Sequence, residues 1–251
     1  MDTFRPQINR FNTAIPIYVQ IAETLLNRIE SGELVPGDRL PPERELSEML
    51  SVNRMTVRRA LNMLAGQGLL IRRRGDGTYV AGPKIELNAG RLFPFTKGMQ
   101  RKGYMPGARV ITFEKKMAGT SVASFLSLPV SAPVYYVHRL RLINQEPVML
   151  EEFTIPTQRF QDFENFDLTS RSLFEILETE YQVTVSQARQ SLEPVLATEY
   201  EAQLLEIEKG APLMLERRVS LDQDGYPIEY SKELYRGDRF RFVTEIASLD
   251  L

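Results

Sequence analysis

Hydrophobic and polar positions in the first eighty residues follow first a helical and then an extended pattern. Apolar residues recur every three or four positions in three segments, which predicts helices over about 16–31, 43–50 and 53–66. Two short apolar runs, 69–71 and 78–80, then flank a glycine turn and predict a β-hairpin. Three helices followed by a hairpin are typical of a winged helix-turn-helix, whose third helix can enter the major groove of DNA.

The rest of the chain alternates between extended and helical patterns. Ala81-Gly82-Pro83 interrupts the hydrophobic pattern and predicts a linker, so we expect domains over 1–80 and 92–251 joined by residues 81–91. The expected fold class is α+β, with an antiparallel sheet of hairpins in the second domain. The predicted strands cover about 108–114, 134–143, 148–154, 183–192, 213–221 and 228–235, and the predicted helices about 96–102, 120–127, 172–180 and 198–207.

The second domain contains an internal repeat. An offset of 79 residues aligns identical residues throughout one register, which predicts a strand, helix, Ala-Pro turn, strand and hairpin unit used twice. Two such units make a pseudo-two-fold domain with a ligand cleft between them, and a chance match of similar elements is the alternative. The pairs are Ala118 with Ala197, Ala123 with Ala202, Leu126 with Leu205, Ala132 with Ala211, Pro133 with Pro212, Arg139 with Arg218, and Leu142 with Leu221.

Composition adds mainly exclusions. The 251 residues are 43% hydrophobic, which is ample for folded cores, and the formal net charge is −2. The absence of cysteine excludes disulfides and thiol nucleophiles, and a single histidine excludes a multi-histidine metal cage, so we expect neither a metal nor a cofactor. No apolar run approaches 18 residues and no signal-like segment is present, so we expect a cytoplasmic protein without a membrane partner.

The small net charge hides an uneven distribution. Residues 51–80 carry six arginines and one aspartate, a local charge of +5, and every basic residue before Lys84 is an arginine. The guanidinium group forms paired hydrogen bonds with phosphate and with guanine. On the third predicted helix, Arg54 and Arg58 lie opposite the apolar face and Asn53 lies at the positively polarised N-terminus. A solvated charged face is the alternative interpretation.

Four ordered motifs occupy this region: Pro16-Ile17-Tyr18, Leu40-Pro41-Pro42-Glu43-Arg44-Glu45-Leu46, Asn53-Arg54-Met55-Thr56-Val57-Arg58-Arg59-Ala60-Leu61 and Arg74-Gly75-Asp76-Gly77-Thr78-Tyr79-Val80. Together they resemble the DNA-binding domain of GntR-type bacterial transcription regulators. The resemblance implies DNA contacts for Arg44, Asn53, Arg54, Thr56, Arg58, Arg74, Gly75 and Gly77.

The resemblance also implies different roles for these DNA contacts. Arg44 and Arg54 are expected to read bases, Arg58 to read a base or clamp a phosphate, and Thr56 to touch a phosphate. The two glycines shape the tip of the wing. For Arg59 and for Arg72, a surface charge without a DNA contact is as compatible with the sequence as a contact.

Two arginines share one face of a predicted strand in the second domain. Period-two alternation places Arg139 and Arg141 side by side, where their guanidinium groups repel each other unless carboxylates or a bound anion lie nearby. The second copy of the repeat keeps the first arginine as Arg218 but has Ser220 in place of the second. Arg141 therefore breaks the symmetry and is the better candidate for a functional role.

A further set of motifs spans the second domain: Arg139-Leu140-Arg141, Pro147, Glu151, Ser172-Leu173-Phe174, Pro227-Ile228-Glu229-Tyr230 and Tyr235-Arg236-Gly237-Asp238-Arg239-Phe240. They resemble the UTRA effector domain of the HutC subfamily of GntR regulators, which implies a chorismate-lyase-like fold without that enzyme's chemistry. The residues implied to bind an effector are Phe93, Thr96, Arg139, Arg141, Glu151, Ser172, Glu229 and Tyr235.

Two positions qualify this assignment of the effector site. The hairpin register decides whether Glu151 or Glu152 lies on the arginine face, since an odd loop selects Glu151 and an even loop selects Glu152. Pro94 stands where sugar-phosphate-binding members have a serine, and it offers neither a hydroxyl nor a backbone N–H. A phosphate site at this point is therefore weakened, although Thr96 can still contribute.

The sequence favours a regulator over an enzyme. It has no phosphate-binding loop, and His138 is the only histidine. We expect a homodimeric transcription repressor that binds a palindromic operator and responds to a small anionic metabolite, such as a phosphosugar or a catabolite. The alternatives are an enzyme of small-molecule metabolism built on the chorismate-lyase-like domain and a constitutive DNA-binding protein without an effector.

Overall fold

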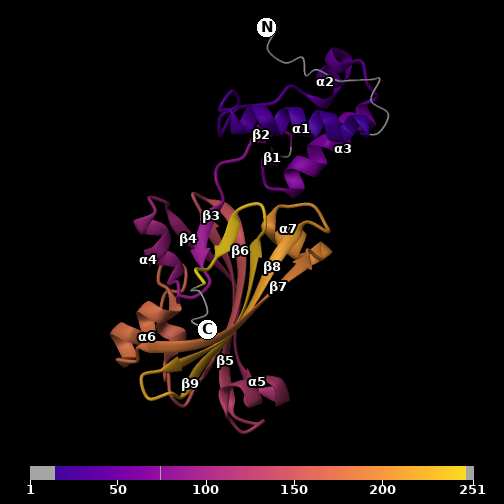
Figure 1. Ribbon diagram of the computed structural model, residues 1–251. Coiled ribbons are helices and arrows are strands. Elements are labelled where there is room, and N and C mark those ends of the chain that lie inside the picture. Colours follow the sequence, from indigo (N-terminus) through magenta and orange to yellow (C-terminus); the bar gives the residue numbers. More distant parts are fainter. Residues whose placement is uncertain (1–14, 74, 247–251) are drawn as a thin grey trace, which may run out of the picture. The chain divides into compact units, whose positions relative to one another are not determined.

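The computed structural model describes residues 15–73 and 75–246. The chain divides into two compact units, Met1–Ile85 and Glu86–Leu251 (Figure 1). Arg74, one of the expected DNA contacts, lies outside the described residues. None of the described helices is long and apolar enough to cross a membrane.

The first unit has the three helices and the hairpin that its sequence predicts. Helices α1 (Ile17–Glu30), α2 (Glu43–Leu50) and α3 (Arg54–Gly66) begin and end within one residue of the predicted bounds. Strand β1 (Leu70–Arg73) pairs antiparallel with β2 (Gly77–Val80). The winged helix-turn-helix is therefore confirmed.

The helices of this unit pack around one apolar core. Leu25 of α1, Leu46 of α2 and Leu61 of α3 are each almost completely buried in it. Full burial of one such side chain contributes about 1.5–3 kcal/mol. Ser51 adopts a left-handed conformation, with φ of 50°, and ends α2, which lets the chain turn sharply into α3.

A six-stranded antiparallel sheet dominates the second unit, with the strand order β4-β5-β6-β9-β8-β7. All six strands and all four helices predicted for this region are present, and the α+β class is confirmed. The strands are β4 (Pro106–Met117), β5 (Pro133–Ile143), β6 (Glu146–Pro156), β7 (Val185–Leu196), β8 (Pro212–Asp222) and β9 (Pro227–Arg236).

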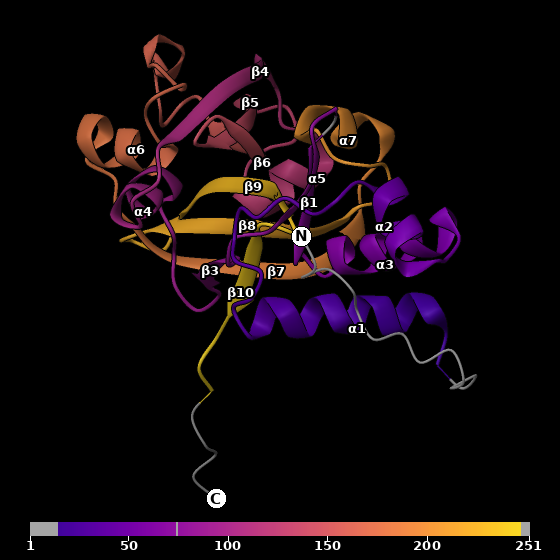
Figure 2. The same cartoon turned by 90° about the horizontal axis from the view of Figure 1, so that it is seen from above.

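Helices cover both faces of this sheet (Figure 2). Helix α6 (Leu173–Tyr181) packs on the face that carries Tyr135 and Val137, and α4 (Phe95–Arg101) meets the same face through Arg141. On the opposite face, α5 (Gly119–Leu126) and α7 (Glu199–Leu205) pack against other apolar side chains of the sheet. The arginine face therefore lies under α4 and α6.

The internal repeat is confirmed in the backbone. A shift of 79 residues moves the printed bounds of β4 onto those of β7, and the bounds of β5 onto those of β8. The turns match as well: the amide of Ala118 donates to the carbonyl of Ala132 at 3.0 Å, and that of Ala197 to the carbonyl of Ala211 at 2.9 Å. The two β4-α5-β5-β6 and β7-α7-β8-β9 units meet at β6 and β9, in the middle of the sheet.

Three short elements were not predicted. Strand β3 (Ile85–Asn88) pairs with β10 (Phe240–Val243), and a 3₁₀ helix covers Phe163–Asn165. Each has only three or four residues, too few to produce a clear periodic pattern in the sequence. Strand β3 lies within the segment 81–91 that the sequence suggests as a linker.

Candidate functional site

One glutamate gathers three arginines on the surface of the first unit. Glu43, the first residue of α2, accepts from Arg58 of α3 at 2.8 Å and from Arg54 of α3 at 3.2 Å. Arg72 of β1 reaches the same carboxylate at 3.4 Å. Hydrogen bonding from Arg58 is the main cause that holds the pKa of Glu43 below its usual value. Arg44 lies apart from this group, exposed and 3.7 Å from Glu48.

The other predicted DNA contacts on α3 have distinct surroundings. The side chain of Asn53 caps the helix by accepting a hydrogen bond from the amide of Met55 at 2.8 Å, so it has a structural role of its own. Thr56 is half-buried. The guanidinium of Arg59 lies 4.0 Å from the ring centre of Tyr18, a packing contact with α1.

Two glycines shape the wing tip. Gly75 has φ of 77° and Gly77 has φ of 150°, conformations that side chains disfavour. Arg39 donates to the carbonyl of Asp76, and a Cβ added to Gly77 would lie 2.9 Å from Nε of Arg39. The wing therefore rests on Arg39, a residue whose role no sequence pattern indicates.

A cavity lies between α4, α6 and the arginine face of the sheet in the second unit. With its mouth it encloses about 350 Å³. Buried charges and three phenylalanine rings share its wall. The lining residues are Phe93, Pro94, Phe95, Arg141, Glu151, Ser172, Leu173, Phe174, Arg218, Glu229 and Glu233.

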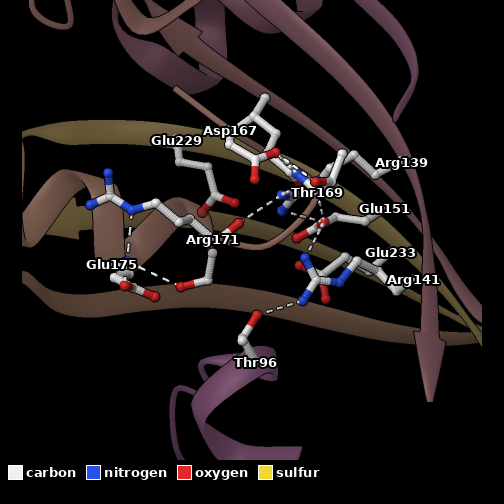
Figure 3. A network of polar contacts seen from close by, with 12 residues as sticks. Thr96, Arg139, Arg141, Glu151, Asp167, Thr169, Arg171, Glu175, Glu229 and Glu233 are labelled. Atoms are coloured by element: carbon white, nitrogen blue, oxygen red, sulfur yellow. Dashed lines mark hydrogen bonds and ion pairs between the residues drawn. The ribbon is translucent and has the colours of Figure 1, made fainter. Parts of the chain in front are cut away.

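Arg139 and Glu151 form a buried ion pair beside this cavity (Figure 3). The hairpin register places Glu151, and not Glu152, directly opposite Arg139. Nε of Arg139 donates to Glu151 at 2.8 Å, while Nη1 donates to the carbonyls of Leu168 at 2.8 Å and Arg171 at 3.2 Å. Arg139 thereby ties the segment before α6 to the sheet.

Arg141 is buried with less compensation. Its Nη2 donates to the hydroxyl of Thr96 at 2.8 Å, and its distance to the Glu151 carboxylate is 3.8 Å (Figure 3). Its buried Nε makes no hydrogen bond to any residue that the structure describes. Burial lowers the pKa of Arg141 to about 10, and the carboxylate of Glu151 offsets this only in part.

Arg218 is surrounded by carboxylates instead. It donates to Glu233 at 2.5 Å, to Glu216 at 2.8 Å and to Glu229 at 3.3 Å. Burial opposes its charge, but these three carboxylates raise the pKa of Arg218 above its ordinary value. Burial also raises the pKa of Glu233 to about 7, and Tyr235 donates to that carboxyl.

The predicted effector residues form one connected network in two layers. Phe93, Arg141, Glu151, Ser172 and Glu229 line the cavity. Behind this wall, Thr96 contacts Arg141, Arg139 contacts Glu151, and Tyr235 contacts Glu233, without lining the cavity themselves.

Sequence reasoning missed several lining residues, notably Arg218 and Glu233. Two signals were available for them. Arg218 is the repeat partner of Arg139, and Glu233 shares the period-two face of Glu229 and Tyr235. Pro94, Phe95 and Phe174 belong to motifs that the sequence singles out, but their approach to the cavity depends on how α4 and α6 dock.

Both units match known families. Residues 17–80 match the bacterial regulatory proteins of the gntR family, and residues 101–241 match the UTRA domain. The chain is 39% identical over 229 residues to the HTH-type transcriptional repressor NagR of Bacillus subtilis, covering 91% of this chain and 94% of NagR. It is 30% identical to the mannosyl-D-glycerate transport/metabolism system repressor MngR of Escherichia coli, covering 91% of this chain and 95% of MngR.

A solved structure shares this architecture. The crystal structure of PhnF from Mycobacterium smegmatis matches with a TM-score of 0.65 and 30% identity, covering 90% of this chain and 99% of PhnF. The enzyme alternative is not supported, because the family and these relatives are regulators. The chain belongs to the GntR family of bacterial regulatory proteins and is a DNA-binding transcription regulator whose C-terminal part is a UTRA domain.

Proposed function

We propose that this regulator is a homodimeric repressor that binds a two-fold operator and is switched by a small anionic effector in the UTRA cavity. Two copies of a winged helix match a palindromic site because a closed dimer and such a site share the same symmetry. The proposed organisation is a DNA-binding domain over 1–80, a linker over 81–91 and an effector-binding and dimerisation domain over 92–251. Effector binding alters repression only if it favours one arrangement of the DNA-binding domains.

On the DNA side, Arg44 and Arg54 are proposed to read bases while Arg58 and Thr56 contact the backbone. Arg54 supports this role because it stands at the start of α3 with its side chain 59% exposed. Replacement of Arg54 by alanine should weaken operator binding by about 1–3 kcal/mol, the usual worth of a bidentate base contact. Equal loss on random DNA would make Arg54 a phosphate contact instead.

On the effector side, the observation that carries the proposal is the undercompensated charge of buried Arg141. A guanidinium kept in this state at a cavity wall is suited to an incoming anionic group. Glu229 and Glu233 are carboxyl groups that can hydrogen-bond hydroxyls, and Phe93 and Phe174 offer apolar faces to a ring. This combination suits a polyhydroxylated sugar derivative that carries one anionic group.

The names of relatives agree with this class of ligand. MngR is named for a mannosyl-D-glycerate system, and another relative, 26% identical, for a fructoselysine utilization operon in Escherichia coli. Pro94 precedes α4 without a side-chain cap, and the hydroxyl of Thr96 already accepts from Arg141. Arg141 with Thr96, and not the backbone at Pro94, is therefore the proposed anion contact.

Thermal unfolding of the full chain tests this function. Sugar phosphates, sugar-acid conjugates and neutral sugars are each added to the wild type, to Arg141→Met and to Arg189→Met, which replaces an exposed arginine of β7. A ligand present at 100 times its Kd stabilises the folded state by about 2.7 kcal/mol. This gain should disappear in Arg141→Met and persist in Arg189→Met. Retained stabilisation and retained release of DNA in Arg141→Met would refute the assignment.

A further inference from the structure

The three arginines around Glu43 come from separate parts of the DNA-binding domain. Arg54 and Arg58 lie on α3 and Arg72 on β1, while Glu43 opens α2. The Glu43 side chain is only 17% exposed, whereas those of Arg54 and Arg58 are 59% and 40% exposed. The carboxylate therefore lies beneath the guanidinium groups, which keep their outer sides open to solvent.

This arrangement addresses two physical costs of a DNA-reading surface. Long arginine side chains lose rotamer freedom when they settle into one geometry against bases, and neighbouring cations repel each other. A shared carboxylate restricts the arginines before DNA arrives and leaves a net charge of +2 from three guanidinium groups and one carboxylate. Glu43 itself is not free to accept from a base, because its two oxygens already face arginines.

We propose that Glu43 is a positioning residue for sequence reading: it holds Arg54 and Arg58 in a fixed arrangement and limits their attraction to DNA of any sequence. This inference rests on the proposed base contact of Arg54. Helix stabilisation by a negative charge near the N-terminus of α2 does not account for the geometry. Glu45 lies in the same first turn, but its side chain is exposed and forms no printed ion pair among the described residues.

Removal of the charge should therefore affect specific and non-specific binding differently. In Glu43→Gln the local charge rises from +2 to +3, so affinity for random duplexes should increase at low salt. The slope of log affinity against log salt concentration should become steeper by about one. The ratio of operator affinity to random-duplex affinity should fall by about tenfold, because the released arginines must be ordered on binding.

The experiment uses the full chain and a duplex that the wild type selects from a random library, with a scrambled duplex of equal length for comparison. Fluorescence anisotropy over a salt series gives both affinities for the wild type and for Glu43→Gln, Glu43→Asp, Glu45→Gln and Arg54→Ala. Glu45→Gln removes the same charge from the same helix turn. Glu43→Asp keeps the charge on a shorter stem, and its ratio should also fall, with an unchanged salt slope.

A lower ratio in Glu43→Gln, with the wild-type ratio in Glu45→Gln, supports the inference. An unchanged ratio in Glu43→Gln, or equal loss in both variants, overturns it. If Glu43→Gln does not fold, the Glu43→Asp ratio decides in the same way. Arg54→Ala separates the two proposals: equal loss on both duplexes refutes base reading by Arg54, whereas selective loss with a normal Glu43→Gln ratio refutes only the role of Glu43.

Discussion

Arg139 and Arg141 are two residues apart on β5 and both are buried, yet their replacement should have different effects on stability. In Arg139→Met, Glu151 loses its partner at 2.8 Å, and the carbonyls of Leu168 and Arg171 lose their donor. Breaking a buried ion pair costs about 3–5 kcal/mol, and each orphaned carbonyl adds about 1–3 kcal/mol. Arg141, 3.8 Å from Glu151, offsets part of this loss, so we expect about 4 kcal/mol.

Arg141→Met should change stability by less than about 1 kcal/mol. Arg141 makes one side-chain hydrogen bond to Thr96 among the described residues, and burial holds its pKa at about 10, below the ordinary value. The folded protein therefore gains little from this charge in the absence of a ligand. Such a cost in stability is common at binding sites.

Calorimetry of the full chain without ligand checks this contrast. For a domain of this size, 1 kcal/mol shifts the melting temperature by about 2–4 °C, so Arg139→Met should lower the UTRA transition by about 8–16 °C. Arg141→Met should shift it by less than about 4 °C. Equal shifts in the two variants would refute the division between a structural and a ligand-binding arginine.

Three further predictions concern single groups. Because the folded-state pKa of Glu233 is raised to about 7, its protonated form stabilises the fold at low pH, and this contribution, of the order of 3 kcal/mol, is lost as pH rises through 7; melting temperatures from pH 5 to 8.5 should fall less steeply in Glu233→Gln, and parallel curves would contradict this. Gly77→Ala should weaken DNA binding in an anisotropy assay, since φ of 150° and the contact with Arg39 both disfavour a side chain, and wild-type affinity would argue against a role for wing geometry. Asn53→Ala should lower the unfolding free energy of the first domain by about 1 kcal/mol in urea through loss of the helix cap, and an unchanged midpoint would show that the cap adds nothing.

The sequence by itself determined the elements and their order. Helix and strand bounds in both domains follow from apolar periodicity, because a long amphipathic segment has one face that must be buried. The repeat followed from identical residues at turns, such as Ala118 and Ala197, where the same backbone hydrogen bond recurs. Strands β3 and β10 were too short to show a pattern, and their pairing joins segments about 150 residues apart.

Only the tertiary structure decided how charges are paired. Sequence spacing placed Arg139 and Arg141 on one strand face, but the register of the β5-β6 hairpin selected Glu151 as their carboxylate. Docking of α4 and of the segment before α6 then made Arg139 a structural tie and left Arg141 undercompensated. Glu43 likewise met three arginines from distant positions. Periodicity reports which face of an element is buried, whereas the energy of a buried charge depends on partners at a few ångströms that come from elsewhere in the chain.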